Sequence, residues 1–364
     1  MRILHVTSAL VGGGAETQLK MLMRGLLDRG HEIGVIYLTD DPDFKSREGI
    51  DCIQIPRGKR WNLWKMYQRI SKAINGFRPD VLHAWLPEIM TIPATLYCRL
   101  HDIPCVSAQR RSLRHVLSWK SRLRDWSILL PHLLANSVAC NFSYAKEPWL
   151  LRKLIESKSG VVIRNGFLLP KQVPAEQPDW LETDAFKVLY VGRLVEQKRV
   201  DLLVQAIAEL KSQSKHVQLA ICGEGACESD LRILARASGL KESQDISFMG
   251  YQSSWQSLAS HFDLFVLPSV AEGMPNVLVE AMGSGLPTVA TNIFEISSFV
   301  EHGKHSFLVH PNCRSDLSKA MGQLSGDQEG MQRLAKAGQA LAESLSSQVM
   351  VQHYNNLYTE IAKA

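Results

Sequence analysis

Short apolar runs alternate with amphipathic segments of helical periodicity along almost the whole chain, in two successive sets. The strand-like runs of the first set are Ile3–Thr7, Glu32–Leu38, Val81–Ala84, Cys105–Ala108 and Leu133–Ala135. Those of the second set are Lys187–Val191, Gln218–Cys222, Ile246–Met249, Leu264–Leu267 and Thr288–Ala290. Strands that alternate with helices are typical of parallel sheets with crossover helices. We therefore expect an α/β fold of two Rossmann-like domains facing each other across a cleft.

A polar stretch with three prolines, Leu168–Pro178, separates the two sets and is predicted to be a linker. The 364 residues suffice for two domains of ordinary size, and a content of 45% hydrophobic and 21% charged residues is typical of a globular enzyme. We expect one domain over residues 1–168 and the other over residues 169–348.

Charge and cysteine content restrict the class of protein. Residues 1–170 carry 25 Lys and Arg against 14 Asp and Glu, whereas residues 171–364 carry 16 against 22. The basic half predicts an anionic partner, such as a membrane surface or a phosphorylated acceptor, with a chance imbalance of solvated faces as the alternative. Seven scattered cysteines without a CxxC pair argue against a disulfide framework or zinc site. With no signal peptide or membrane span in the pattern, we expect a cytoplasmic protein.

The segment Glu272–Glu280 carries the most specific chemistry. Its two carboxylates lie eight positions apart across a Gly-x-Pro turn, and Glu280 falls inside an apolar run that predicts the start of a helix. A helix N-terminus presents backbone N–H groups that suit pyrophosphate. The carboxylate of Glu280 would then accept hydrogen bonds from ribose hydroxyls, and Glu272 would hold a sugar. The alternative is an ordinary strand, loop and helix with two solvated acids.

Two cations follow the strand that ends at Val191. Arg193 and Lys198 lie five positions apart on a loop before a helix predicted to begin near Val200, so both can point at one diphosphate. A solvated pair on a loop is the alternative. Glycines and an aromatic residue end the neighbouring strands, at Gly192, Gly223, Gly250 and Tyr251. An open α/β sheet binds its ligand at this carboxyl end of its strands.

In the first domain, a glycine-rich turn, Gly12–Gly14, precedes an amphipathic helix and would let the backbone approach a ligand closely. A merely tight turn explains it equally well, and the GxGxxG spacing of dehydrogenases is absent. His83 ends a predicted strand and is expected to face the cleft, although a single histidine is more often structural.

Together these motifs resemble the retaining glycosyltransferases of family 4, the group 1 glycosyltransferases with the GT-B fold. The resemblance rests on the paired glutamates, on Gly-Arg-Leu-x-x-x-Lys at residues 192–198 and on Gly-Gly-x-Glu at residues 13–16. It implies transfer of a sugar from a nucleoside-diphosphate donor to a hydroxyl of a glycan or polyprenyl-linked acceptor. UDP is the nucleotide expected in that donor. It further implies surface polysaccharide biosynthesis and a same-face reaction that keeps the anomeric configuration. Neither a cofactor nor a metal ion is implied.

The resemblance also implies roles for individual residues. Arg193, Lys198 and Glu272 are expected to be catalytic. The donor is expected to contact Gly13, Gly14, Gly192, Gly223, Gly250, Tyr251, Gly273, Met274, Pro275, Asn276, Val277 and Glu280. Candidate sugar or acceptor contacts are Glu16, His83, Gln109, Arg110 and Arg111. Gln109 and Arg110 stand where many relatives carry a histidine that contacts the transferred sugar, and the two arginines suit an acceptor phosphate equally well.

Three further patterns bear on partner or metal sites. Residues 110–126 interleave basic residues with leucines and tryptophans, which predicts peripheral contact with an anionic membrane at the inner face of the cell membrane, with a solvated helix as the alternative. No nucleic-acid-binding motif accompanies them. Asp41-Pro42-Asp43 imitates a metal motif and is predicted to be a turn. A zinc site at His302, His305 and His310 is not expected.

Two functional alternatives stay open on sequence alone: a non-catalytic subunit that binds a nucleotide sugar and regulates a partner, and a nucleotide-sugar epimerase on the same fold. A phosphorylase would require a lysine that anchors pyridoxal phosphate and usually a longer chain.

At the C-terminus, residues 349–361 have apolar side chains spaced three and four apart, which predicts a helix with one buried face. The resemblance implies that this helix, within residues 349–364, crosses back to the N-terminal domain. We therefore expect Leu357 and Tyr358 to contact residues below 170.

Overall fold

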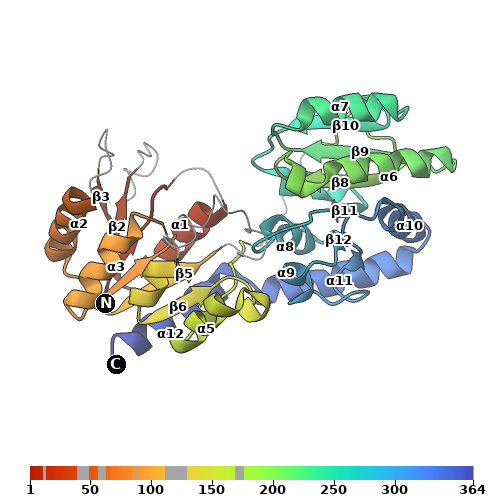
Figure 1. Cartoon of the computed structure of the whole chain (residues 1–364). Helices are drawn as coiled ribbons and strands as arrows, with labels where there is room; N and C mark the ends of the chain where they lie inside the picture. Colours follow the sequence, from red (N-terminus) through yellow and green to blue (C-terminus); the bar gives the residue numbers. More distant parts are fainter. Residues whose placement is uncertain are drawn as a thin grey trace. The chain divides into compact units, whose positions relative to one another are not determined.

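The computed structural model describes residues 1–10, 14–38, 49–55, 63–86, 88–110, 129–168 and 176–363. The chain forms two compact units (Figure 1). The first comprises Met1–Gly166 together with Ser347–Ala364, and the second comprises Phe167–Ser346.

Within the described residues, the first unit contains a sheet of seven parallel strands in the order β3-β2-β1-β4-β5-β6-β7. The strands are β1 (Arg2–Val6), β2 (Glu32–Tyr37), β3 (Ile50–Gln54), β4 (Val81–Ala84), β5 (Cys105–Gln109), β6 (Ser137–Cys140) and β7 (Val161–Val162). The helices are α1 (Gly14–Leu27), α2 (Leu63–Phe77), α3 (Thr91–Leu100), α5 (Trp149–Ser157) and α12 (Ser347–Ile361). The strand order reverses between β1 and β4, so this is a doubly wound sheet whose switch point lies between these two strands.

Helices cover both faces of this sheet because successive strand residues point to opposite sides. Ile3 packs in a cluster with buried residues of α1 and α12. Leu4 and Val6 pack in a second cluster with α2 and α3. The first unit is therefore a three-layer sandwich with a buried sheet.

The last helix, α12, completes the core of the first unit. It buries Met350, Val351, Tyr354, Leu357 and Tyr358 in the same cluster as Ile3. The hydroxyl of Tyr358 lies 2.6 Å from Nδ1 of the buried His83. Figure 1 shows α12, in blue, against the orange and yellow elements of this unit. The predicted return of the C-terminal helix to the N-terminal domain is confirmed.

In the second unit, the described residues form a sheet of six parallel strands in the order β10-β9-β8-β11-β12-β13. The strands are β8 (Phe186–Val191), β9 (Val217–Cys222), β10 (Ile246–Gly250), β11 (Leu264–Leu267), β12 (Thr288–Thr291) and β13 (Phe307–Val309). The helices are α6 (Val200–Ser212), α7 (Glu228–Ala237), α8 (Asn276–Gly283), α9 (Phe294–Ser297), α10 (Arg314–Leu324) and α11 (Gln328–Ser344), with 3₁₀ turns η3 (Glu196–Lys198) and η4 (Trp255–His261). Because β8 and β11 are neighbours, the loops that follow them begin side by side.

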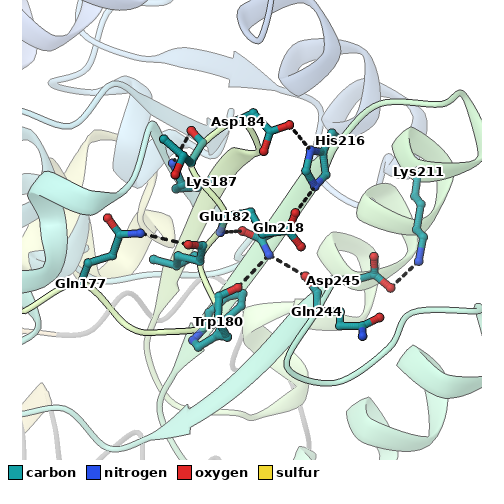
Figure 2. Close-up of polar contacts among 12 residues, drawn as sticks. Gln177, Trp180, Glu182, Asp184, Lys187, Lys211, His216, Gln218, Gln244 and Asp245 are labelled. Atoms are coloured by element: carbon teal, nitrogen blue, oxygen red, sulfur yellow. Dashed lines mark hydrogen bonds and ion pairs between the residues drawn. The ribbon is translucent and has the colours of Figure 1, made fainter.

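A buried glutamine ties the segment before β8 to the amino end of this sheet. The side-chain amide of Gln218 donates to the carbonyl oxygens of Trp180 (3.0 Å) and Gln244 (2.7 Å), and its Oε1 accepts from the backbone N–H of Glu182 (2.8 Å) (Figure 2). Beside it, Lys211 pairs with Asp245. These polar contacts close the end of the sheet opposite the loops discussed below.

The strand predicted at Leu133–Ala135 is wrong. Residues 129–134 are helical, and the strand of this region is β6, four positions further along. The four residues of β6 are buried but include serine, alanine and cysteine, whose small side chains give a weaker hydrophobic signal than the leucines before them. None of the described helices combines the length and apolar character needed to span a bilayer.

The packing of α12 predicts a stability effect. Replacing Tyr358 with alanine should lower the free energy of unfolding of the first unit by about 3–5 kcal/mol, because a fully buried aromatic ring leaves a cavity. Urea denaturation measures this change. His353→Ala, an exposed position on the same helix, is the matched control and should shift stability by no more than about 0.5 kcal/mol. Equal effects of the two variants would contradict the packing of α12.

Candidate functional site

An ion pair joins the two charged motifs of the second unit. Nζ of Lys198, at the end of η3, lies 2.5 Å from Oε1 of Glu272, and the two side chains are only 11% and 8% exposed. Lys198 follows β8 and Glu272 follows β11, so the neighbouring positions of these strands bring together residues that are 74 apart in sequence. The structure thus places two of the three predicted catalytic residues in direct contact.

The loops that carry this pair are also tied to each other through their backbones. The N–H of Val270 donates to the carbonyl of Gln197 (3.0 Å), and the side-chain amide of Gln197 donates to the carbonyl of Ala271. Thr291, at the end of β12, donates to the carbonyl of Ser269. These bonds hold Lys198 and Glu272 on a fixed backbone frame.

Two of the predicted glycines pack backbone against backbone. Gly192 and Gly223 have φ values of 154° and 151°, where L side chains are rare, and a Cβ on Gly223 would overlap the carbonyl oxygen of Gly192. The N–H of Gly223 donates to the carbonyl of Gly250 (2.7 Å). The ends of β8, β9 and β10 therefore form one continuous surface made largely of backbone, which suits close approach of a ligand.

Arg193 lies on the same surface. Its side chain is exposed, and its carbonyl accepts a hydrogen bond from the buried hydroxyl of Tyr190 (3.1 Å). Burial raises the pKa of Tyr190, the charge of Glu272 raises it further, and the charge of Arg193 lowers it. The carboxylate and the guanidinium therefore act in opposite directions on one buried hydroxyl.

Glu280 lies one turn into α8. Its carboxylate accepts hydrogen bonds from the side chains of Trp255 and Gln256, both on η4, with a distance of 3.3 Å for Gln256. Burial raises the pKa of Glu280, and these two hydrogen bonds partly oppose the shift. The two hydrogen bonds from η4 thus hold the Glu280 carboxyl group in a fixed orientation at the start of α8.

The remaining predicted donor contacts surround the start of α8 or follow β10. Gly273 is half-buried, Met274 and Pro275 are buried, and Asn276 and Val277 form the half-buried first turn of the helix. Tyr251 is 74% exposed, and its N–H donates to the carboxylate of Glu224 (3.3 Å). The backbone N–H groups at the start of α8 follow Glu272 by four residues, so an anion can meet both the helix N-terminus and the loop.

Sequence reasoning missed the supporting residues of this site. Tyr190, Trp255 and Gln256 orient Arg193 and Glu280, yet none of them lies in a motif. Gln197 sits beside Lys198 and could have been singled out by that position. Tyr190 meets Arg193 only three positions away, whereas Trp255 and Gln256 reach Glu280 through the fold, so the sequence carries no local signal for these two.

In the first unit, some of the predicted site residues lie in the described part of the chain and others do not. Gly14 is the exposed first residue of α1, and Glu16 is half-buried in its first turn. Gly13 and Arg111 lie outside the described residues, as do all of residues 110–126 after Arg110.

Gln109 ends β5 and is held by a buried histidine. Oε1 of Gln109 lies 2.7 Å from Nε2 of His132, whose Nδ1 lies 2.8 Å from the hydroxyl of Ser107. Burial lowers the pKa of His132 to about 3, so the ring is neutral. An amide oxygen can only accept, which assigns the ring proton to Nε2 and makes the serine the donor to Nδ1.

His83 and Arg110 lie under α12. His83 is fully buried between Tyr358, Tyr354 and Trp85, and burial lowers its pKa well below the usual range. Arg110 donates to Asn165 (2.8 Å) and to the hydroxyl of Tyr354 (2.9 Å). We therefore assign His83 to the attachment of α12 instead of to the cleft that the sequence suggested.

A single group of three clustered metal-type ligands occurs in the described part of the chain. Glu182 and Asp184 approach opposite ring nitrogens of His216, at 3.2 and 3.4 Å (Figure 2). Since the two nitrogens point in different directions, this arrangement fits two ion pairs better than one shared cation. His302 and His305 accept backbone N–H bonds from Leu308 and Glu301, and His310 pairs with Asp316.

Comparisons with known proteins match both units. A family model described as glycosyl transferases group 1 matches residues 185–327, and one described as glycosyltransferase family 4 matches residues 12–169. The chain is 25% identical over 353 residues to the lipopolysaccharide core biosynthesis glycosyltransferase LpsE of Rhizobium meliloti (strain 1021), covering 95% of each protein. It is 25% identical over 370 residues to LpsD of the same organism, covering 98% of each.

A solved structure gives the same fold. The crystal structure of Anabaena HepE in complex with UDP superimposes with a TM-score of 0.80 at 20% identity, over 99% of this chain and 100% of that one. This likeness confirms the predicted fold of two Rossmann-like domains.

The buried carboxylate of Glu280 predicts a pH dependence. Its raised pKa means that the folded state keeps the proton to higher pH than the unfolded chain does. Stability is therefore lost as the pH rises from the ordinary glutamate pKa, about 4.3, through the folded value, and stays lower above it. Glu280→Gln cannot ionise, so it should be more stable than the original chain at pH 7, and the difference should shrink towards zero in acid. Urea denaturation across this range measures it, and a pH-independent difference would count against the assignment.

Proposed function

This chain belongs to the group 1 glycosyltransferases of family 4, and from that membership we propose that it transfers a sugar from UDP to a hydroxyl of a glycan or polyprenyl-linked acceptor. We propose further that the anomeric configuration is retained, that no metal ion or cofactor is required, and that the product is a surface polysaccharide. The name of LpsE supports the acceptor class, and the UDP complex of HepE supports UDP as the first donor to test.

The observation that carries the proposal is the Lys198–Glu272 ion pair beside the start of α8. A leaving diphosphate needs positive charge, which Lys198, Arg193 and the N–H groups of α8 supply together. Glu280 would accept hydrogen bonds from the ribose, and Glu272 those of the sugar ring. Because side-chain cations and backbone dipoles provide this charge, we expect activity to persist in a chelator.

Retention follows from the proposed same-face reaction, in which the leaving diphosphate takes the proton of the acceptor hydroxyl. A double displacement would instead need a carboxylate free to attack the anomeric carbon. Glu272 is held by Lys198 at 2.5 Å, so its charge is already engaged. The work of the second unit is then to position the donor and stabilise its leaving group.

The first test is direct. Purified protein is incubated with a panel of nucleoside-diphosphate sugars, with and without lipid-linked glycan acceptors, and the released nucleotide and the product linkage are measured. Release of UDP with an α-linked product from an α-linked donor supports the proposal. No nucleotide release with any donor, although UDP binds, would identify a non-catalytic binding subunit instead.

Glu280→Ala should weaken the binding of UDP by about 1–3 kcal/mol, because the ribose hydroxyls lose a charged acceptor. Isothermal titration calorimetry measures the affinity. Glu242→Ala, an exposed acid of the same unit that pairs with Arg232, is the matched control and should bind UDP normally. Unchanged affinity in Glu280→Ala would refute the ribose assignment.

Lys198→Ala should lower turnover by roughly 100-fold while changing the affinity for UDP less, because its charge acts mainly on the departing diphosphate. Steady-state kinetics at saturating donor separates the two effects. Lys211→Ala removes a paired lysine at the opposite end of the same sheet (Figure 2) and should leave turnover intact. Near-normal turnover in Lys198→Ala would rule out the leaving-group role.

A further inference from the structure

A tryptophan at the end of β4 is hydrogen-bonded to the beginning of α1. Trp85 is fully buried, and its indole Nε1–H donates to the carbonyl oxygen of Ala15 at 2.8 Å. Ala15 is the second residue of α1, between Gly14 and Glu16. This bond is long-range, since 70 positions separate its partners. It ties the first turn of α1 to the switch point of the sheet.

The side chain of an arginine lies over the face of this tryptophan ring. The guanidinium carbon of Arg110 lies 3.3 Å from the centre of the Trp85 ring, within the range of a cation–π contact. Its two terminal nitrogens donate to Asn165 and Tyr354 at 2.8 and 2.9 Å. Burial lowers the pKa of Arg110, as expected where water is excluded and the cation–π contact is strongest. The guanidinium plane is thus fixed on three sides.

The third partner comes from the far end of the chain. Tyr354 is a fully buried residue of α12, and its ring centre lies 6.0 Å from that of Trp85. One turn later, the hydroxyl of Tyr358 lies 2.6 Å from His83, and among the described residues it makes no hydrogen bond to Arg110 or Trp85. A continuous chain of contacts therefore runs from α12 through Tyr354, Arg110 and Trp85 to Ala15.

We infer that Trp85 is a positioning residue that transmits the docking of α12 to the first turn of α1. This inference rests on the proposed function together with the sequence prediction that Gly14 contacts the donor and Glu16 the sugar or acceptor. When α12 is docked, Tyr354 fixes Arg110, Arg110 fixes the indole plane, and the indole N–H sets the position of Ala15. Loosening any of these contacts releases the start of α1 without touching the Lys198–Glu272 pair of the second unit.

The test compares three variants by amide hydrogen exchange and by kinetics. Trp85→Phe keeps a ring but removes the N–H donor, and Tyr354→Phe removes the hydroxyl that accepts from Arg110. Tyr358→Phe is the matched control, because it removes an equally buried hydroxyl one turn away on the same helix. The amides of Gln18 and Leu19 report on the first turn, since they bond to the carbonyls of Gly14 and Ala15 in a regular helix.

We expect exchange at Gln18 and Leu19 to be about five- to tenfold faster in Trp85→Phe and Tyr354→Phe, in line with the loss of one hydrogen bond, and unchanged in Tyr358→Phe. The same two variants should lose a similar factor in kcat/KM, with UDP affinity intact. Exchange that is equal in all three variants overturns the inference. Faster exchange without loss of kcat/KM overturns the positioning role.

Failure of the proposed function gives a different result. If the original chain transfers no sugar, the kinetic comparison is void and the function falls, whereas the exchange pattern still decides whether α12 and α1 are coupled through Trp85. The two failures are therefore distinguishable.

Discussion

Parallel pairing of the strands is the constraint on which the rest of the structure depends. In a parallel sheet every strand ends at the same edge, so all loops that follow strands meet there. In the second unit this gathers the loops after β8, β9, β10 and β11, and it places Lys198 against Glu272. In the first unit it brings Trp85 after β4 and Arg110 after β5 into contact. The loops at these edges therefore bring together side chains that are far apart in sequence.

The Lys198–Glu272 pair shows how the candidate site accommodates two nearly buried charges. Two nearly buried charges are costly unless each is matched, so either side chain alone would be destabilising. On the proposed function, an arriving diphosphate provides Lys198 with a new anion, and the sugar hydroxyls provide Glu272 with new donors. On this proposal, the contact between Lys198 and Glu272 is replaced by contacts of each side chain with the ligand. The pair thereby holds both side chains in place when no donor is bound.

Much of this fold could be predicted from sequence because its signals are local. The long alternation of strands and helices, the glycine before Arg193 and the periodicity of α12 each act within a few residues. Misses occurred where local signal is weak. β3, an edge strand with two polar residues, and β6, built of small side chains, lack strong apolar runs. Leu133 lies in a helix and is 54% exposed, so its apolar character was misleading.

The candidate site likewise contains residues that the sequence could predict and residues that it could not. The charged residues of the motifs could be singled out, since Arg193, Lys198 and Glu272 lie on segments that follow predicted strands and Glu280 lies in the predicted helix after Glu272. Two of their supports could not, because Gln256 and Trp85 acquire their roles only through contacts with residues 24 and 70 positions away. His83 illustrates the limit: its position at the end of β4 was predicted correctly, but what covers it is a helix more than 260 positions further along the chain. No local pattern contains that information.

The return of α12 to the first unit also affects the order in which the two units can fold. The second unit is continuous in sequence, whereas the first needs residues 347–363 to cover His83, Trp85 and the side of α1. Until that segment is available, a large apolar surface and the buried groups of Arg110 stay exposed to water. Closing the first unit therefore brings together ends separated by the whole second unit, which adds a loop-closure cost that grows slowly with length. A second unit that is already compact shortens this loop, so the folding of the continuous unit favours completion of the discontinuous one.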